Sequence, residues 1–212
     1  MHLTVIAKAP VAGQVKTRLC PPCTPGQAAD IAEAALADTL EAIVLVVGGT
    51  GIRPVLLIDG EPPAVTPAEF EVVPQRGDGL EQRLRHGFCD LGPGIIVGMD
   101  TPHAVAGLSA AFGQLERGVD VLGLAVDGGF WAIGLACVDD DDFLAAVFGD
   151  VPMSTSRTGV YQLRRLHQLG RPVHMLASTR DLDTVEDLLA AAGDKRVGRL
   201  GGVLSAVAAT LR

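Results

Sequence analysis

The feature that most constrains the fold is the alternation of short apolar runs with helical patterns along the 212-residue chain. The apolar runs have the length of strands and lie at residues 3–7, 55–58, 71–74, 94–99, 119–126, 130–136 and 173–177. Several have no polar interruption, as expected of strands in a parallel sheet that is covered on both faces. The sequence therefore predicts a three-layer α/β/α, Rossmann-like domain with a mostly parallel mixed sheet.

Helical spacing fills the segments between these runs. Helices are predicted at about 79–90, 103–117, 155–169, 184–192 and 199–211, and another begins after Thr24, where Thr24-Pro25-Gly26-Gln27 resembles a capping box. The runs at 119–126 and 130–136 are joined only by Asp127-Gly128-Gly129, which is typical of a tight hairpin turn. We therefore expect one antiparallel element within the sheet. With no repeat or linker, residues 1–212 are expected to form a single domain.

Composition excludes some classes of function. The formal net charge of −8 argues against a nucleic-acid-binding protein, although local cations can still bind a small anion. No apolar stretch reaches the roughly 18 residues that a membrane span needs. The N-terminus lacks the basic and apolar regions of a secretory signal, so we expect a cytoplasmic protein. Nothing in the sequence decides whether it forms a homo-oligomer.

The four cysteines include one CxxC pair, Cys20 and Cys23. A zinc site would need a second close pair, but Cys89 and Cys137 stand alone. A redox role would place the pair at a strand-to-helix turn, and a helix does follow at Thr24. We favour cysteines without a chemical role, and a redox protein is the alternative.

The segment after the first strand, AKAPVAGQVKTRL at 7–19, has the residues of a phosphate-binding loop. In open α/β sheets, ligands bind beyond the carboxyl ends of the strands. Gly13 permits a positive φ or a close backbone approach, Lys16 and Arg18 supply positive charge, and Thr17 supplies a hydroxyl. The segment is not a Walker A loop, and a solvated surface loop is the alternative.

Acidic residues follow three later elements. Asp100 ends the strongest apolar run, where a carboxylate can bind a hard divalent cation, although an Asx turn or a helix cap is the alternative. Asp127 precedes two glycines that would let a ligand approach the main chain, or it forms only a turn, and the nearby Trp131 is expected in the core. Asp181 and Asp183 precede a predicted helix, which they could simply cap.

The order of these segments resembles the nucleotide-diphospho-sugar transferase superfamily, which has a glycosyltransferase-A-type fold. The resemblance lies in AKAPVAGQVKTRL at 7–19, QRGDGLEQRL at 75–84, GMDTPH at 98–103, AVDGGFWAIGL at 125–135, MSTSRTGVYQL at 153–163 and DLDTVEDL at 181–188. Within the superfamily the chain is most similar to a little-characterised bacterial branch often described as glycosyltransferases. A related set of motifs, with a KTRL loop and a terminal DxDT, occurs in the 2-phospholactate guanylyltransferases, and the molybdenum-cofactor nucleotidyltransferases are more distant relatives of the branch. The branch commonly has GSDCP, DGGYY and WST where this chain has GMDTP, DGGFW and MST.

The resemblance implies a role for each segment. The residues expected to bind the nucleotide are Ala7, Lys8, Gly13, Lys16, Thr17, Arg18, Gln75 and Gly77. Lys16, Arg18 and Asp100 are the expected catalytic residues, and Asp100 and Asp183 are the expected ligands of Mg²⁺ or Mn²⁺. The acceptor is expected to lie beside Asp127, Gly128 and Gly129.

The implied function is a metal-dependent transferase with a nucleotide or nucleotide-sugar donor and an unidentified small-molecule acceptor. Direct displacement would occur at phosphorus in a nucleotidyltransferase and at an anomeric carbon in a glycosyltransferase, and the motifs fit either reaction. The altered acceptor-side motifs leave open a non-catalytic nucleotide-binding or regulatory protein on the same fold, since fold alone does not decide function.

Overall fold

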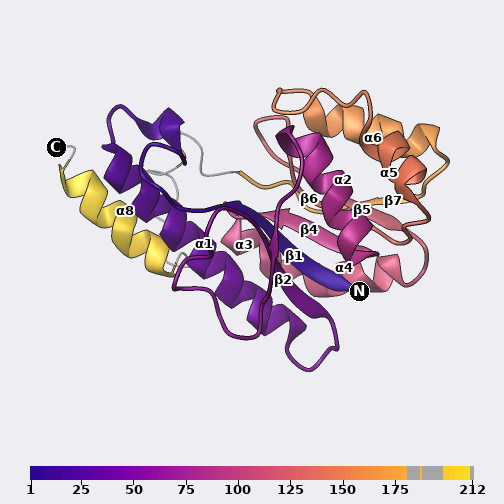
Figure 1. The fold of residues 1–212 in the computed structure, drawn as a ribbon, viewed down its shortest axis with the longest axis horizontal. Helices are drawn as coiled ribbons and strands as arrows, with labels where there is room; N and C mark the ends of the chain where they lie inside the picture. Colours follow the sequence, from indigo (N-terminus) through magenta and orange to yellow (C-terminus); the bar gives the residue numbers. More distant parts are fainter. Residues whose placement is uncertain (181–186, 188–197, 211–212) are drawn as a thin grey trace.

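A computed structural model describes residues 1–180, Asp187 and 198–210 (Figure 1). Its strands are β1 (His2–Lys8), β2 (Arg53–Asp59), β3 (Glu71–Pro74), β4 (Gly94–Gly98), β5 (Asp120–Leu124), β6 (Phe130–Leu135) and β7 (Val173–Met175). They form a seven-stranded sheet in the order β3-β2-β1-β4-β6-β5-β7. Strand β6 is antiparallel to both of its neighbours, and the other pairings are parallel. The predicted mixed sheet with one inserted antiparallel strand is confirmed.

Helices cover both faces of this sheet (Figure 1). They are α1 (Pro25–Val47), α2 (Gly79–Leu91), α3 (Pro102–Val105), α4 (Ser109–Leu115), α5 (Asp141–Phe148), α6 (Thr158–Gln168) and α8 (Gly198–Thr210), with 3₁₀ turns η1 (Thr17–Leu19) and η2 (Ala106–Leu108). The prediction of one continuous helix over 103–117 is wrong, because η2, which contains the weak helix former Gly107, separates α3 from α4. The helix predicted at 184–192 lies outside the described residues except for Asp187. None of the described helices is long and apolar enough to cross a membrane.

The core lies in two layers, one on each face of the sheet. On β4, Ile95 and Val97 pack into the layer beneath α1, whereas Ile96 packs into the layer beneath α2, α5 and α6. All three side chains are almost completely buried. The unbroken apolar run in this strand therefore reflects burial on both faces, which makes the sheet a rigid support for the loops at its edge.

Helix α1 is buried on two sides and connects the sheet to α8. Its N-terminus has the predicted capping box, because the backbone N–H of Gln27 donates to Thr24 Oγ1 and the backbone N–H of Thr24 donates to Gln27 Oε1. Helix α8 packs against its outer side (Figure 1). There the carboxylate of Asp38 accepts hydrogen bonds from the backbone N–H groups of Arg199 and Leu200, so an acid inside α1 caps the first turn of α8.

The parallel strands bring distant loops to one edge of the sheet. In the strand register Lys8 lies beside Asp59, and Ile6 lies beside Gly98. The loops after β1 and β4 therefore leave the sheet at the same edge. The buried hydroxyl of Thr39, on α1, lies 3.0 Å from the main-chain oxygen of Met99 and helps to fix the backbone just before Asp100.

Candidate functional site

The loop after β1 forms a cavity of about 270 Å³ with the segment that follows β4. Its walls come from the end of β1, the loop up to η1, the inner side of α1 and the residues after β4. The lining residues are Lys8, Gln14, Val15, Lys16, Thr17, Arg18, Ala32, Met99 and Asp100. The structure thus brings together five of the predicted site residues, three of them cations, at the carboxyl ends of two neighbouring strands. We call this the loop cavity.

Lys16 extends into the loop cavity toward Asp100. Its Nζ lies 2.8 Å from Asp100 Oδ2, and its side chain is only 6% exposed, against 27% for that of Asp100. The backbone of Lys16 is left-handed, with φ 48° and ψ 34°, a conformation that costs about 1–2 kcal/mol for a residue with a Cβ. Val15 is buried in the core beneath α1 and Leu19 in the core between α1 and α8, so the loop is anchored on both sides of the strained residue. These anchors hold the ammonium group at the carboxylate.

Asp100 and Thr101 do not cap the helix that follows them. Helix α3 begins after Thr101, whose side chain makes no capping hydrogen bond. Among the residues that the structure describes, neither Asp100 Oδ1 nor Thr101 Oγ1, both buried, has a hydrogen-bond partner. Buried polar atoms usually have partners, so the unpaired oxygen of Asp100, a residue that lines the loop cavity, indicates a place where a ligand could complete the coordination. The geometry does not support the capping alternative for Asp100.

A second cavity of about 420 Å³ adjoins the first at Arg18, which lines both. It has an apolar side formed by Leu80 and Phe130 and a hydroxyl-bearing side formed by the loop before α6. The remaining lining residues are Asp127, Gly129, Ser154, Thr155, Ser156 and Thr158. Asp127 Oδ1 accepts a hydrogen bond of 2.8 Å from the backbone N–H of Gly129, so the residue forms the expected turn and still presents its exposed carboxylate to this cavity. We call it the hydroxyl cavity.

The two glycines after Asp127 have different environments. Gly129 lines the hydroxyl cavity, whereas Gly128 packs directly against the loop before α6. A Cβ at Gly128, which has a φ of +93°, would lie 1.9 Å from the main-chain oxygen of Ser156. The main-chain oxygen of Gly128 also accepts a hydrogen bond from the N–H of Gly159, at the start of α6. Gly128 therefore holds the turn against the loop that forms the hydroxyl side of the cavity.

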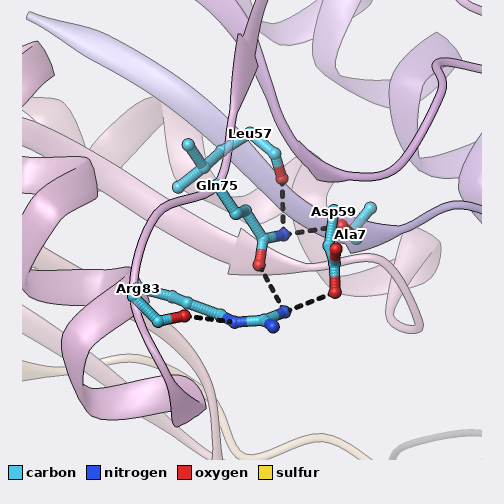
Figure 2. A network of polar contacts seen from close by, with 6 residues as sticks. Ala7, Leu57, Asp59, Gln75 and Arg83 are labelled. Atoms are coloured by element: carbon cyan, nitrogen blue, oxygen red, sulfur yellow. Dashed lines mark hydrogen bonds and ion pairs between the residues drawn. The ribbon is translucent and has the colours of Figure 1, made fainter.

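Gln75 uses its side-chain amide to tie the strand ends together (Figure 2). Its Nε2 donates to the main-chain oxygens of Ala7, at 2.6 Å, and Leu57, at 2.9 Å. Its Oε1 accepts a hydrogen bond of 3.0 Å from Arg83 Nη1, which also forms an ion pair of 2.8 Å with Asp59 Oδ2. Both N–H groups of the amide are thus engaged by carbonyls of β1 and β2. Gln75 positions these strand ends, and its predicted contact with a nucleotide stays a prediction.

Gly77 belongs to the same network, because its main-chain oxygen lies 3.4 Å from Arg83 Nε. Gly13 has a φ of +79°, and a Cβ there would meet nothing within 4 Å, so its backbone conformation rather than close packing favours glycine. Asp183 lies outside the described residues. In the part of the chain that the structure describes, no group of three or more His, Cys, Asp or Glu side chains could hold a metal ion.

Sequence reasoning missed Arg83, Asp59 and the three hydroxyl residues 154–156. Arg83 and the hydroxyl residues could have been found from their position, because they lie within two segments that carry the family resemblance. Arg83 lies within QRGDGLEQRL, and the hydroxyl residues lie within MSTSRTG. The indole of Trp131 is buried, as expected, and its N–H donates to the main-chain oxygen of Ala177.

The CxxC pair does not have the environment of a redox motif. Cys20 and Cys23 are both free thiols, and Cys23 is almost completely buried. Burial raises the pKa of the Cys23 thiol, whereas catalytic CxxC cysteines have a lowered pKa. The pair follows η1 rather than a strand, so the geometry favours cysteines without a chemical role.

A larger cavity of about 540 Å³ lies between α1 and α8. Its lining includes Asp30, Glu33, Val203 and Val207 but none of the predicted site residues. It lies on the outer side of α1, away from the loops at the carboxyl ends of the strands. We therefore place the candidate site at the loop and hydroxyl cavities, where the charged and hydroxyl groups converge.

The fold is that of the nucleotide-diphospho-sugar transferases. A crystal structure described as a "putative nucleotide-diphospho-sugar transferase" from Desulfovibrio desulfuricans G20 aligns with a TM-score of 0.75, covering 98% of this chain and 99% of that one at 17% sequence identity. No curated protein sequence matches the chain. Residues 31–155 match the family described as "Uncharacterized protein conserved in bacteria (DUF2064)", and the chain belongs to this family.

Proposed function

We propose that this protein is a transferase that takes a nucleotide or nucleotide sugar as donor and transfers a group from it to a small-molecule acceptor. One observation carries the proposal: Lys8, Lys16 and Arg18 converge with Asp100 in one cavity, and Arg18 also lines a second cavity. A concave cationic site at the carboxyl ends of parallel strands is suited to an anionic ligand. The adjoining cavity provides room for an acceptor beside it. The similarity in fold to a protein described as a transferase agrees with this assignment.

In this proposal the loop cavity holds the phosphates of the donor. Lys16 and Arg18 donate hydrogen bonds to phosphate oxygens and stabilise the negative charge that grows on the leaving group. Removing one such well-aimed donor typically costs about 3 kcal/mol of transition-state stabilisation. Gly13 and Thr17 shape the same loop, and Lys8 adds charge at the end of β1. Ala7, next to Lys8 on β1, accepts a hydrogen bond from Gln75, and we assign the base and ribose of the donor to the region around Ala7, Gln75 and Gly77.

We further propose that Asp100, together with Asp183, holds Mg²⁺ or Mn²⁺. The fit rests on Asp100, a lining residue of the loop cavity, whose buried Oδ1 has no hydrogen-bond partner in the described part of the chain and whose Oδ2 lies 2.8 Å from Lys16 Nζ. Carboxylate oxygen is the ligand type that these hard cations prefer. When bound, the ion would neutralise phosphate oxygens of the donor.

The acceptor is assigned to the hydroxyl cavity. Asp127 and Gly129 line it, and Gly128 holds its wall in place. The donor and acceptor would thus meet at Arg18, the residue common to both cavities. Holding two reactants side by side in a fixed orientation is a main source of rate enhancement in transfer reactions.

Thermal unfolding with a panel of nucleoside triphosphates and nucleotide sugars, each with and without Mn²⁺, tests the proposal. A ligand at about 100 times its Kd stabilises the folded state by roughly 2.7 kcal/mol. Product analysis then separates the two reactions, because nucleotidyl transfer from a triphosphate releases pyrophosphate and glycosyl transfer releases the nucleotide. A ligand that binds without turnover would indicate the non-catalytic alternative.

Asp100→Asn is expected to remove the dependence of donor binding on Mn²⁺ while the protein remains folded. Asp150→Asn is the matched control, since it makes the same chemical change in a side chain that is 96% exposed. No stabilisation by any compound in the panel would contradict the proposed function. Unchanged metal dependence in Asp100→Asn would contradict the metal site alone.

A further inference from the structure

Lys16 forms an ion pair with Asp100, the residue that the proposed function assigns as a ligand of the divalent metal ion. Lys16 Nζ lies 2.8 Å from Asp100 Oδ2. Because Asp100 Oδ1 is buried, the oxygen that faces the loop cavity is the one that the ammonium already contacts. We propose that Lys16 and the divalent ion compete for Asp100, and that the phosphates of the donor draw Lys16 away from it. The inference rests on the proposed function.

The position of Lys16 is built into the loop. Its side chain is 6% exposed, its backbone is left-handed, and buried residues anchor the loop on both sides. A backbone in this region persists only where the surrounding structure enforces it, and such residues cluster at functional sites. A solvated surface lysine would need none of these features. The loop therefore keeps one positive charge at Asp100 when no donor is bound.

Competition follows from charge. An ammonium group and a divalent cation that share one carboxylate repel each other at such short separations, and the burial of the Lys16 side chain reduces the screening by water. The metal alone must therefore displace Lys16 or bind weakly. A phosphate in the same cavity offers Lys16 a new anionic partner and leaves Asp100 to the metal. By linkage, donor and metal then raise each other's affinity by the same factor.

Mn²⁺ titration followed by electron paramagnetic resonance, without nucleotide, tests the competition directly. Lys16→Met removes the charge and keeps the length of the side chain, so Mn²⁺ should bind about tenfold more tightly or better than to the unmodified protein. Lys16→Gly should give the same gain and also relieves the left-handed backbone. Lys8→Met is the matched control, because Lys8 is an exposed cation of the same cavity that forms no ion pair with Asp100 in the described structure. Its gain should be much smaller.

Adding Asp100→Asn to Lys16→Met should abolish the gain. Unchanged or weaker Mn²⁺ binding in both Lys16 variants would overturn the competition, as would an equal gain in Lys8→Met, which would indicate a general effect of charge. If the gain in Mn²⁺ affinity of Lys16→Met persists after Asp100→Asn is added, the proposed competition is also overturned. These results leave the proposed function standing if the unmodified protein still binds and turns over a donor. Failure of every donor to bind, with the Mn²⁺ gain intact, would instead overturn the proposed function alone.

Discussion

Replacing Gly128 by alanine tests whether the turn after β5 shapes the hydroxyl cavity through direct packing. The new Cβ would lie 1.9 Å from the main-chain oxygen of Ser156, where non-bonded carbon and oxygen atoms need more than about 3 Å. The turn and the loop before α6 must then separate by about 1 Å. The φ of +93° adds strain of about 1–3 kcal/mol for any residue with a side chain.

Separation would also break the hydrogen bond of 2.9 Å from the Gly159 N–H to the Gly128 main-chain oxygen, worth about 1 kcal/mol. Together these effects predict a loss of about 2–4 kcal/mol in the free energy of unfolding, with some relaxation of the loop. For a chain of this size, such a loss lowers the Tm by roughly 4–16 °C. Urea and thermal unfolding measure both quantities.

Gly129→Ala is the matched control. The atoms nearest to its Cβ would be those of the Asp127 carboxylate, at 3.2 Å or more, and its φ is not in the positive region. We expect a loss under about 1 kcal/mol, in the range of an ordinary surface substitution. Equal losses in the two variants, or an unchanged Tm in Gly128→Ala, would refute the packing argument. Donor binding in the loop cavity should survive Gly128→Ala, because that cavity does not include the turn.

Three further predictions concern buried polar groups. Burial lowers the pKa of His2 from 6.5 to about 4, so the unfolded chain binds the proton more readily between these values. The free energy of unfolding should therefore fall by up to about 3 kcal/mol as the pH drops through that window, and urea unfolding at pH 7 and 4.5 should show a smaller change in His2→Gln. Arg171→Met removes the two hydrogen bonds of 2.8 Å that the guanidinium donates to the fully buried carboxylate of Asp120 and leaves the one from the backbone N–H of Ala136; it should cost about 3–5 kcal/mol in thermal unfolding, part of it recovered by adding Asp120→Asn. Asp38→Ala removes the cap of α8 and should cost about 1–2 kcal/mol, with faster proteolysis of that helix as the second measure.

Much of the fold could be predicted because burial on both faces of a sheet leaves a local signal. The unbroken apolar run of β4 indicated a covered parallel strand, and Asp127-Gly128-Gly129 indicated the tight turn that makes β6 antiparallel. The capping box at Thr24 is equally local, since both of its hydrogen bonds join residues three positions apart. The break between α3 and α4 was missed because an apolar helical pattern continues across Gly107.

The site was predicted less completely, because its contacts join residues that are distant in the sequence. The contact between Lys16 and Asp100 depends on the pairing of β1 with β4. A local sequence pattern does not predict which strands pair. Gln75 looked like a ligand-binding residue from its motif, yet its amide donates to the main chain of two other strands. Side-chain direction is set by packing, so a motif can place a residue at the right edge of the sheet without revealing what it contacts.

The two cations of the first loop illustrate this difference and indicate distinct roles. The sequence gives Lys16 and Arg18 the same chemistry, but the structure buries the lysine beside Asp100 and leaves Arg18 exposed between the two cavities. If the proposed function is correct, the buried cation paired with a carboxylate sets the charge that a donor meets in the loop cavity. The exposed guanidinium common to both cavities would then contact the donor and the acceptor together. Loss of Lys16 should therefore alter donor and metal binding, whereas loss of Arg18 should also alter the response to the acceptor.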